Sequence, residues 1–201
     1  SHRAFQEMTS SPRVSKEDIE EVFSDLEATT QGERITINDV YYNTKVPFAY
    51  DYADNDPDVF PKSSSHGMHV AGIIAGKDES ATVADGEAFE NEENGFIGVA
   101  PNAQLMICKV FPDREDGTEG GAETDDVLAA LSDCITVGVD VINMSLGTSA
   151  GFSRFLDDTA INEVYDSIYA AGINLVVAAS NSGSSASYGS YGSTNLKENT
   201  G

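Results

Sequence analysis

Apolar positions recur at helical spacing near the start of the chain and at strand spacing soon after. The order Ser15, Lys16, Glu17, Asp18 is typical of a capping box, and it predicts a helix over residues 16–28. The apolar face of that helix would be formed by Ile19, Val22, Phe23 and Leu26. Residues 46–52 alternate around a proline, so we expect a strand there, followed by an acidic turn at 54–58.

Three later apolar runs, at residues 104–110, 139–144 and 173–179, predict buried strands. Helical patterns at 124–137 and about 157–171 separate them. Strands that are apolar on both faces and alternate with helices predict an α/β fold, in which helices pack on a parallel sheet. Residues 77–98 are polar and lack periodicity, which predicts a surface insertion, and residues 184–201 predict a loop or the start of a linker.

A further helix is predicted to begin at a serine cluster, with His66 near its start and Gly76 at its end. Its apolar residues Val70, Ile73 and Ile74 would point toward a core. The imidazole of a histidine titrates near physiological pH, and the helix behind it is rigid. His66 is therefore a candidate general base.

Composition and charge narrow the classes of function. The chain has 201 residues with 40% hydrophobic content, which indicates one globular domain with a sizeable core. Its 34 acidic and 11 basic residues give a net charge of −23, which argues against nucleic acid or an anionic membrane as a partner. Because no apolar run approaches the ~18 residues of a membrane helix, no membrane insertion is predicted in this segment.

The cysteines and the groups that could hold a metal have simple interpretations. Cys108 and Cys134 lie in apolar surroundings, which favours free core thiols over a disulfide.

His66 and His69 could ligate a metal, but no third ligand has suitable spacing. His69 is interpreted as a structural histidine that faces the core. Acidic clusters could hold structural calcium, although solvated loops are the favoured interpretation because no ligand spacing supports an assignment. These clusters are residues 54–58, 85–93 and 113–126.

Three sequence blocks together carry a resemblance to a known family: Ser65-His66-Gly67-Met68-His69-Val70-Ala71-Gly72-Ile73, residues 140–147 with Ser145-Leu146-Gly147, and residues 176–183 with Asn181. In this order they resemble the subtilisin-like serine proteases, whose fold is a parallel β-sheet with helices on both faces. Lys45-Val46-Pro47-Phe48, Tyr52-Ala53-Asp54-Asn55 and the His-Gly-Met-His variant are similar to Gram-positive cell-envelope proteinases of the lactocepin and streptococcal C5a peptidase group. The resemblance implies an extracellular or cell-wall serine endopeptidase that needs no cofactor for its chemistry.

The resemblance also implies roles for particular residues. His66 would be the catalytic histidine, and Asn181 would stabilise the oxyanion, although Ser180 precedes it where the family usually has glycine. A protein or peptide substrate would bind in extended conformation along one strand and against one pocket wall. The strand would be formed by Gly120, Gly121 and Ala122, and the wall by Ser145, Leu146 and Gly147.

The family's Asp-Ser/Thr-Gly and Gly-Thr-Ser-Met motifs do not occur in these residues. We therefore expect residues 1–201 to form the central part of a peptidase domain, with the remainder of that domain as a partner and no activity on their own. In the lactocepin group an inserted domain commonly follows the oxyanion asparagine, and residues 184–201 would suit that junction. The alternative is a non-catalytic module that keeps the fold and binds peptides.

Overall fold

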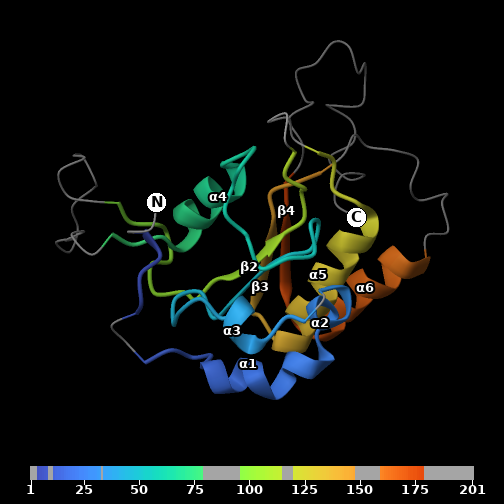
Figure 1. The fold of residues 1–201 in the computed structure, drawn as a ribbon, viewed down its shortest axis with the longest axis horizontal. Coiled ribbons are helices and arrows are strands. Elements are labelled where there is room, and N and C mark those ends of the chain that lie inside the picture. Colours follow the sequence, from blue (N-terminus) through green and yellow to red (C-terminus); the bar gives the residue numbers. More distant parts are fainter. Residues whose placement is uncertain are drawn as a thin grey trace, which may run out of the picture. The chain divides into compact units, whose positions relative to one another are not determined.

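The structure is a computed structural model that describes residues 4–8, 11–32, 34–78, 96–114, 120–147 and 159–178. They fall into two units, Ser1–Thr136 and Val137–Gly201, and each unit is described by itself. Both contain helices and parallel strands (Figure 1), which confirms the α/β fold. Most of the predicted insertion at 77–98 and all of the tail at 184–201 lie outside the described residues.

The first helix, α1 (Lys16–Val22), begins at the predicted capping box. Ser15 Oγ accepts a hydrogen bond from Asp18 N at 3.1 Å, and Asp18 Oδ2 accepts one from Ser15 N at 2.7 Å. The predicted helix over 16–28 is wrong in its second half. A 3₁₀ turn, η2 (Phe23–Asp25), follows α1, and a separate helix, α2 (Glu27–Gln31), begins after an extended residue.

A carboxylate from another helix explains where α2 starts. Asp133 lies on α5 (Thr124–Val137), whose bounds agree with the predicted 124–137, and it is fully buried. It accepts hydrogen bonds from Glu27 N at 2.5 Å and Ala28 N at 3.0 Å, and the Tyr52 hydroxyl donates to it at 2.5 Å. Two unpaired N–H groups of the first turn of α2 are thereby satisfied. Burial raises the pKa of Asp133 above its ordinary value, although the three hydrogen bonds act in the opposite direction.

Strands β1 (Phe48–Asp51) and β2 (Met106–Lys109) pair in parallel and confirm the centres of the two predicted strands. All four residues of β1 are buried. A short helix, α3 (Ile37–Val40), which the apolar pattern does not predict, precedes β1 and contacts it. The core beside these strands includes a cluster of buried side chains from β1, the helix α4 and the segments before each strand: Val46, Ala49, Ala71, Ala75 and Leu105.

Helix α4 (His66–Ala75) begins and ends as predicted, with Gly76 at its C-cap. Its buried residues are small, namely Ala71, Gly72 and Ala75. The expectation that Ile73 faces a core is wrong, because its side chain is 60% exposed, while Val70 and Ile74 are half-buried.

A later segment of backbone packs closely against the end of α4. Residues 98–100 run against its last turn, where Val99 N donates to Ile73 O at 2.9 Å. A Cβ atom on Gly98 would lie 2.6 Å from Gly72 O, which is closer than real Cβ contacts come. Glycine at position 98 therefore permits this close approach.

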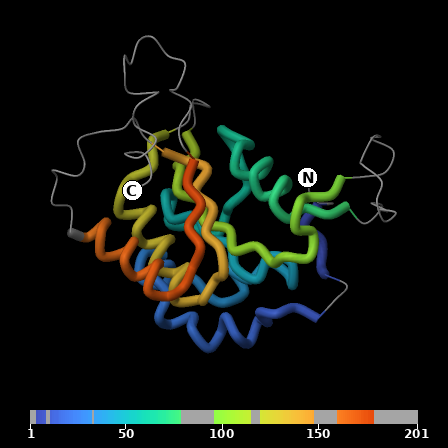
Figure 2. Tube along the Cα trace, turned by 180° about the vertical axis from the view of Figure 1, so that it is seen from behind, coloured from blue at the N-terminus to red at the C-terminus, as the bar shows by residue number. Residues whose placement is uncertain are grey.

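In the second unit, β3 (Val141–Met144) and β4 (Asn174–Val177) pair in parallel. Helix α6 (Thr159–Ala170) runs beside them (Figure 2). Ile142 and Met144 are buried, whereas Val141 and Val176 are about half exposed. Within the described residues of this unit, β3 buries one face and β4 has no fully buried residue, so the expectation of strands buried on both faces is wrong here.

Cys108 on β2 and Cys134 on α5 are free thiols, as predicted, with Sγ atoms 4.0 Å apart. The hydrogen bond between the two thiols and their burial raise the pKa of Cys108 well above its ordinary value. Because the thiolate is the reactive form, Cys108 is a poor nucleophile at neutral pH.

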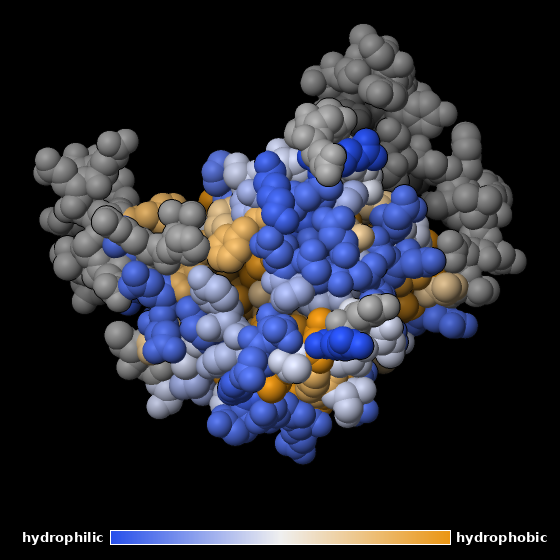
Figure 3. Space-filling model, viewed as in Figure 1, coloured by the Kyte–Doolittle hydropathy of each residue, from blue (hydrophilic) through white to orange (hydrophobic). Residues whose placement is uncertain are grey.

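Hydrophilic residues cover much of the face seen in Figure 3, as a net charge of −23 would suggest. Among the described helices, none has the length and apolar character needed to cross a membrane.

We expect Asp133→Ala to lower the free energy of unfolding by about 3 kcal/mol, because it leaves buried donors without an acceptor. Asp133→Asn keeps one acceptor oxygen and should cost less.

The raised pKa of Asp133 means that the folded state binds the proton of this carboxyl group more tightly than the unfolded state. The contribution of Asp133 to stability should therefore fall as the pH rises above about 4 in the wild type, and Asp133→Asn should remove that dependence. Urea unfolding followed by circular dichroism at several pH values measures both effects. Equal stability of the Ala and Asn variants would contradict the capping role.

Candidate functional site

His66 is the first residue of α4, and it is exposed. Its backbone N–H donates to Ser64 Oγ at 3.4 Å, whereas the N-cap residue Ser65 makes no side-chain hydrogen bond to the helix. His69, one turn later, is also exposed, so its interpretation as a core-facing histidine is wrong. An exposed imidazole at the start of a helix can exchange a proton with a molecule bound beside it.

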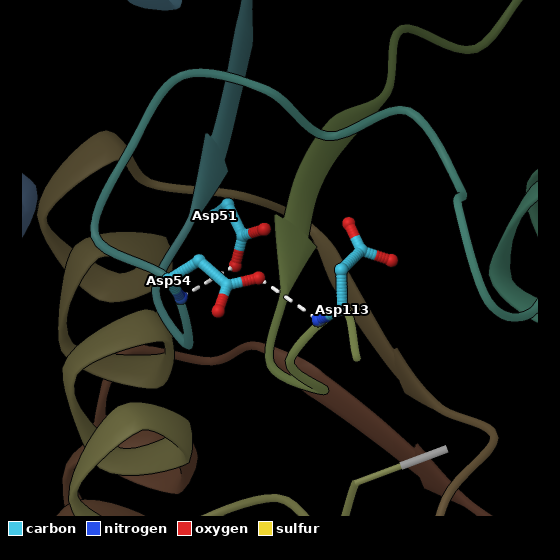
Figure 4. Close-up of side chains that lie close together, drawn as sticks. All are labelled: Asp51, Asp54 and Asp113. Atoms are coloured by element: carbon cyan, nitrogen blue, oxygen red, sulfur yellow. Dashed lines mark hydrogen bonds between the residues drawn. The ribbon is translucent and has the colours of Figure 1, made fainter. Parts of the chain in front are cut away.

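Three carboxylates gather at the carboxyl ends of β1 and β2 (Figure 4). Asp51, the last residue of β1, pairs in register with Lys109, the last residue of β2. The N–H groups of Ala53 and Asp54 both donate to Asp51 Oδ1 at 3.0 Å. Asp113, in the loop after β2, donates its N–H to Asp54 Oδ2 at 2.9 Å. Carboxylates thus join the two loops that follow these strands.

The ammonium group of Lys109 offsets part of this negative charge. Its Nζ contacts the carboxylate of Asp51 and lies 3.3 Å from Asp54 Oδ2 and 3.2 Å from Asp113 Oδ2. Burial raises the pKa of Asp51, whose side chain is 1% exposed, despite the opposing effect of Lys109. Burial also acts to lower the pKa of Lys109, but the hydrogen bonds and charges of the carboxylates outweigh it and raise that pKa. The lysine therefore stays charged at physiological pH.

Asp113 also reaches the segment that leads into α4. Its Oδ1 accepts hydrogen bonds from Lys62 N at 3.2 Å, Ser63 N at 3.3 Å and Ser63 Oγ at 3.2 Å. Ser63 stands three residues before His66. The loop after β2 is thus tied to the chain immediately before the candidate base.

One oxygen from each of Asp51, Asp54 and Asp113 could contact the same cation, because these atoms lie within 4.8 Å of one another. Asp54 and Asp113 come from two of the acidic runs that the sequence offers as calcium candidates. Lys109 already contacts all three carboxylates and supplies one positive charge among them. The expectation of structural calcium stays untested.

Sequence reasoning singles out neither Asp51 nor Lys109 as part of a site, and it offers Asp113 only as one member of the acidic run at 113–126. The available signal is the pairing of two predicted strands, because residues that follow neighbouring parallel strands meet at one edge of the sheet. Without knowledge that strands 46–52 and 104–110 are neighbours, that signal cannot be used.

The predicted substrate strand lies in the first unit. Gly120 is buried, and a Cβ atom there would lie 2.5 Å from Pro112 Cγ. Gly121 is exposed, and a Cβ atom there would have no neighbour within 4 Å among the described residues. The binding role of residues 120–122 stays a prediction.

The predicted pocket wall, residues 145–147, follows β3 in the second unit. Asn143 Nδ2 donates to Ser145 Oγ at 2.9 Å, and Gly147 is exposed. Asn181 lies outside the described residues. The pocket and oxyanion roles therefore stay predictions.

Comparison with known proteins gives consistent matches. A model of the subtilase family, Peptidase S8, matches residues 17–199. The PI-type proteinase of Lactococcus lactis subsp. cremoris is 36% identical over 149 residues, which cover 73% of this chain and 7% of that protein. Subtilisin DY of Bacillus licheniformis is 36% identical over 129 residues, or 64% of this chain and 38% of that protein. The solved structure of MycP1 with its N-terminal propeptide removed has 22% identity and a TM-score of 0.49, and the match covers 71% of this chain and 40% of that chain. The chain thus spans a small part of the length of the lactococcal relatives.

We expect Lys109→Met to lower the free energy of unfolding by about 3 kcal/mol near pH 7, because it leaves the buried carboxylate of Asp51 without a cation. The loss should shrink as the pH falls, since protonation removes the uncompensated charge. Lys62→Met is the matched control: this side chain is 58% exposed and lies 3.0 Å from Asp58, so its loss should change stability by at most about 0.5 kcal/mol. Denaturant unfolding at pH 5 and pH 7 measures the difference. Similar losses for both variants would show that Lys109 is an ordinary surface lysine.

Proposed function

Because this chain belongs to the subtilase family, we propose that the full-length protein that contains it is a serine endopeptidase acting on proteins. The observation that carries this proposal is an exposed histidine at the start of α4, inside the region that matches the family. The similarity to the lactococcal proteinases and to subtilisins supports the same reaction class.

In the proposed reaction His66 is both base and acid. It takes the proton from a serine hydroxyl as that oxygen attacks the carbonyl carbon of the scissile bond, and it then donates the proton to the leaving amine. An aspartate orients the imidazole and stabilises its charged form. We propose that the remainder of the catalytic domain supplies this aspartate and the serine. Acid–base and nucleophilic steps by side chains require no cofactor.

The substrate would bind in extended conformation along residues 120–122, with the side chain before the scissile bond against residues 145–147. The exposure of Gly121 supports this arrangement. The amide of Asn181 would donate to the carbonyl oxygen as negative charge develops on it. We also propose an extracellular or cell-wall location, which the resemblance to cell-envelope proteinases supports.

The second candidate function is a non-catalytic module that binds peptides. It is favoured if the full-length protein lacks the aspartate or the serine. A full-length protein that binds extended peptides, but neither hydrolyses them nor reacts with a fluorophosphonate, would establish this alternative.

His66→Ala in the full-length protein should lower kcat on the order of 10⁶-fold, because the serine loses its base. His69→Ala is the matched control, since it removes an exposed histidine one turn further along α4 and should keep most of the activity. Peptide hydrolysis and fluorophosphonate labelling measure both variants. Residues 1–201 alone should show neither hydrolysis nor labelling. An active His66→Ala protein would refute the assignment of the base.

Asn181→Ala in the full-length protein should lower kcat roughly 10²–10³-fold with little change in KM, because the side chain donates to the oxyanion formed in the transition state. If Asn181 is only a turn residue, the same change should lower the melting temperature and spare the rate. Steady-state kinetics together with thermal unfolding separate the two roles. A folded Asn181→Ala protein with unchanged kcat would rule out the oxyanion role.

A further inference from the structure

The chain enters α4 without the usual local cap. Ser65 precedes the helix but makes no side-chain hydrogen bond to it, and the contact from His66 N to Ser64 Oγ is long, at 3.4 Å. A helix that lacks a firm cap tends to fray in its first turn. His66 stands in that first turn, so something else must fix where its imidazole lies.

Asp113 supplies a fixed point just ahead of this turn. One carboxylate oxygen, Oδ1, accepts from two successive backbone N–H groups, Lys62 N and Ser63 N, and from Ser63 Oγ, at 3.2–3.3 Å. Because two of the three donors belong to the backbone, these contacts constrain the path of the chain itself. The side chain of Asp113 is 12% exposed, so water competes weakly for these bonds.

Asp113 is in turn held by the sheet. Its N–H donates to Asp54 Oδ2, and its other oxygen lies 3.2 Å from Lys109 Nζ. Lys109 ends β2 and contacts the carboxylate of Asp51, which ends β1 in register with it. A continuous series of contacts therefore runs from the ends of two paired strands to residues 62–63, three and four residues before the histidine.

We propose that Asp113 is a positioning residue that places His66 for catalysis by anchoring residues 62–63 to the ends of β1 and β2. The catalytic part of this inference rests on the proposed peptidase function, while the anchoring of the segment does not. Asp113 touches neither substrate nor reacting atoms in this role. A shift of about 1 Å in a catalytic group can cost on the order of 10²-fold in rate, so losing the anchor should be visible in kcat.

Three variants of the full-length protein test the proposal. Asp113→Ala removes the acceptor, and it should lower kcat roughly 10- to 100-fold with KM nearly unchanged. Asp113→Asn keeps an oxygen for the backbone N–H groups and loses the charge that pairs with Lys109, so it should restore most of kcat. Asp58→Ala is the matched control. Asp58 is an acidic residue that precedes the same segment, and its carboxylate pairs with the exposed side chain of Lys62. It should leave kcat unchanged.

Hydrogen exchange of the peptide covering residues 61–70, measured by mass spectrometry, gives a readout besides activity. Asp113→Ala should speed exchange there at least several-fold, whereas Asp113→Asn and Asp58→Ala should leave it near the wild-type rate. All assays are run under conditions in which circular dichroism shows each variant to be folded.

The outcomes distinguish this inference from the proposed function. A wild-type protein that neither hydrolyses peptides nor is labelled by a fluorophosphonate refutes the peptidase and with it the catalytic part, while exchange still decides the anchoring. Unchanged exchange in Asp113→Ala overturns the anchoring. Faster exchange with unchanged kcat in an active protein overturns the positioning role, as does an Asp113→Asn protein that behaves like Asp113→Ala.

Discussion

One partly buried ammonium group, Lys109 Nζ, makes it feasible to gather three carboxylates at the ends of β1 and β2. In a chain with a net charge of −23, further negative charge at this edge is costly unless a cation lies among the carboxylates. With Lys109 in place, Asp51 and Asp113 remain free to accept hydrogen bonds from the backbone. The path of both loops, and through them the start of α4, therefore depends on this one side chain.

The same use of carboxylates explains the acidic run that follows β1. Asp56 Oδ1 accepts from Asp58 N at 2.7 Å, and Asp58 Oδ1 accepts from Phe60 N at 3.2 Å. Loops that carry chemistry lack the hydrogen bonds of a strand ladder, so their N–H groups need other acceptors. Aspartates supply them here at short range. The run at 54–58 thus has an explanation in its own backbone, which the sequence interpretation as a merely solvated loop does not include.

Local signals were enough to predict much of the fold, and long-range contacts account for what they missed. The bounds of α5, the capping box at Ser15 and the end of α4 at Gly76 depend on residues within a few positions of one another. The break before α2 depends on Asp133, more than 100 positions away. The exposure of Ile73 depends on which face of α4 packs in the core, where Ala71 and Ala75 lie. Likewise the short motif around His66 identifies the candidate base, whereas its link to Asp113 spans about 50 positions and follows only from strand pairing.

In each unit, taken separately, the candidate residues follow the carboxyl ends of parallel strands. The segment before His66 follows β1, residues 113 and 120–122 follow β2, and residues 145–147 follow β3. In parallel α/β sheets this end is where ligands bind, because the loops there are free to vary while the strands hold their ends in place. A base on such a loop is only as well placed as the contacts between the loop and the strands. In the first unit those contacts are carboxylates that bind backbone N–H groups, so precision at the candidate base depends on electrostatics at the edge of the sheet as well as on the apolar core that holds α4.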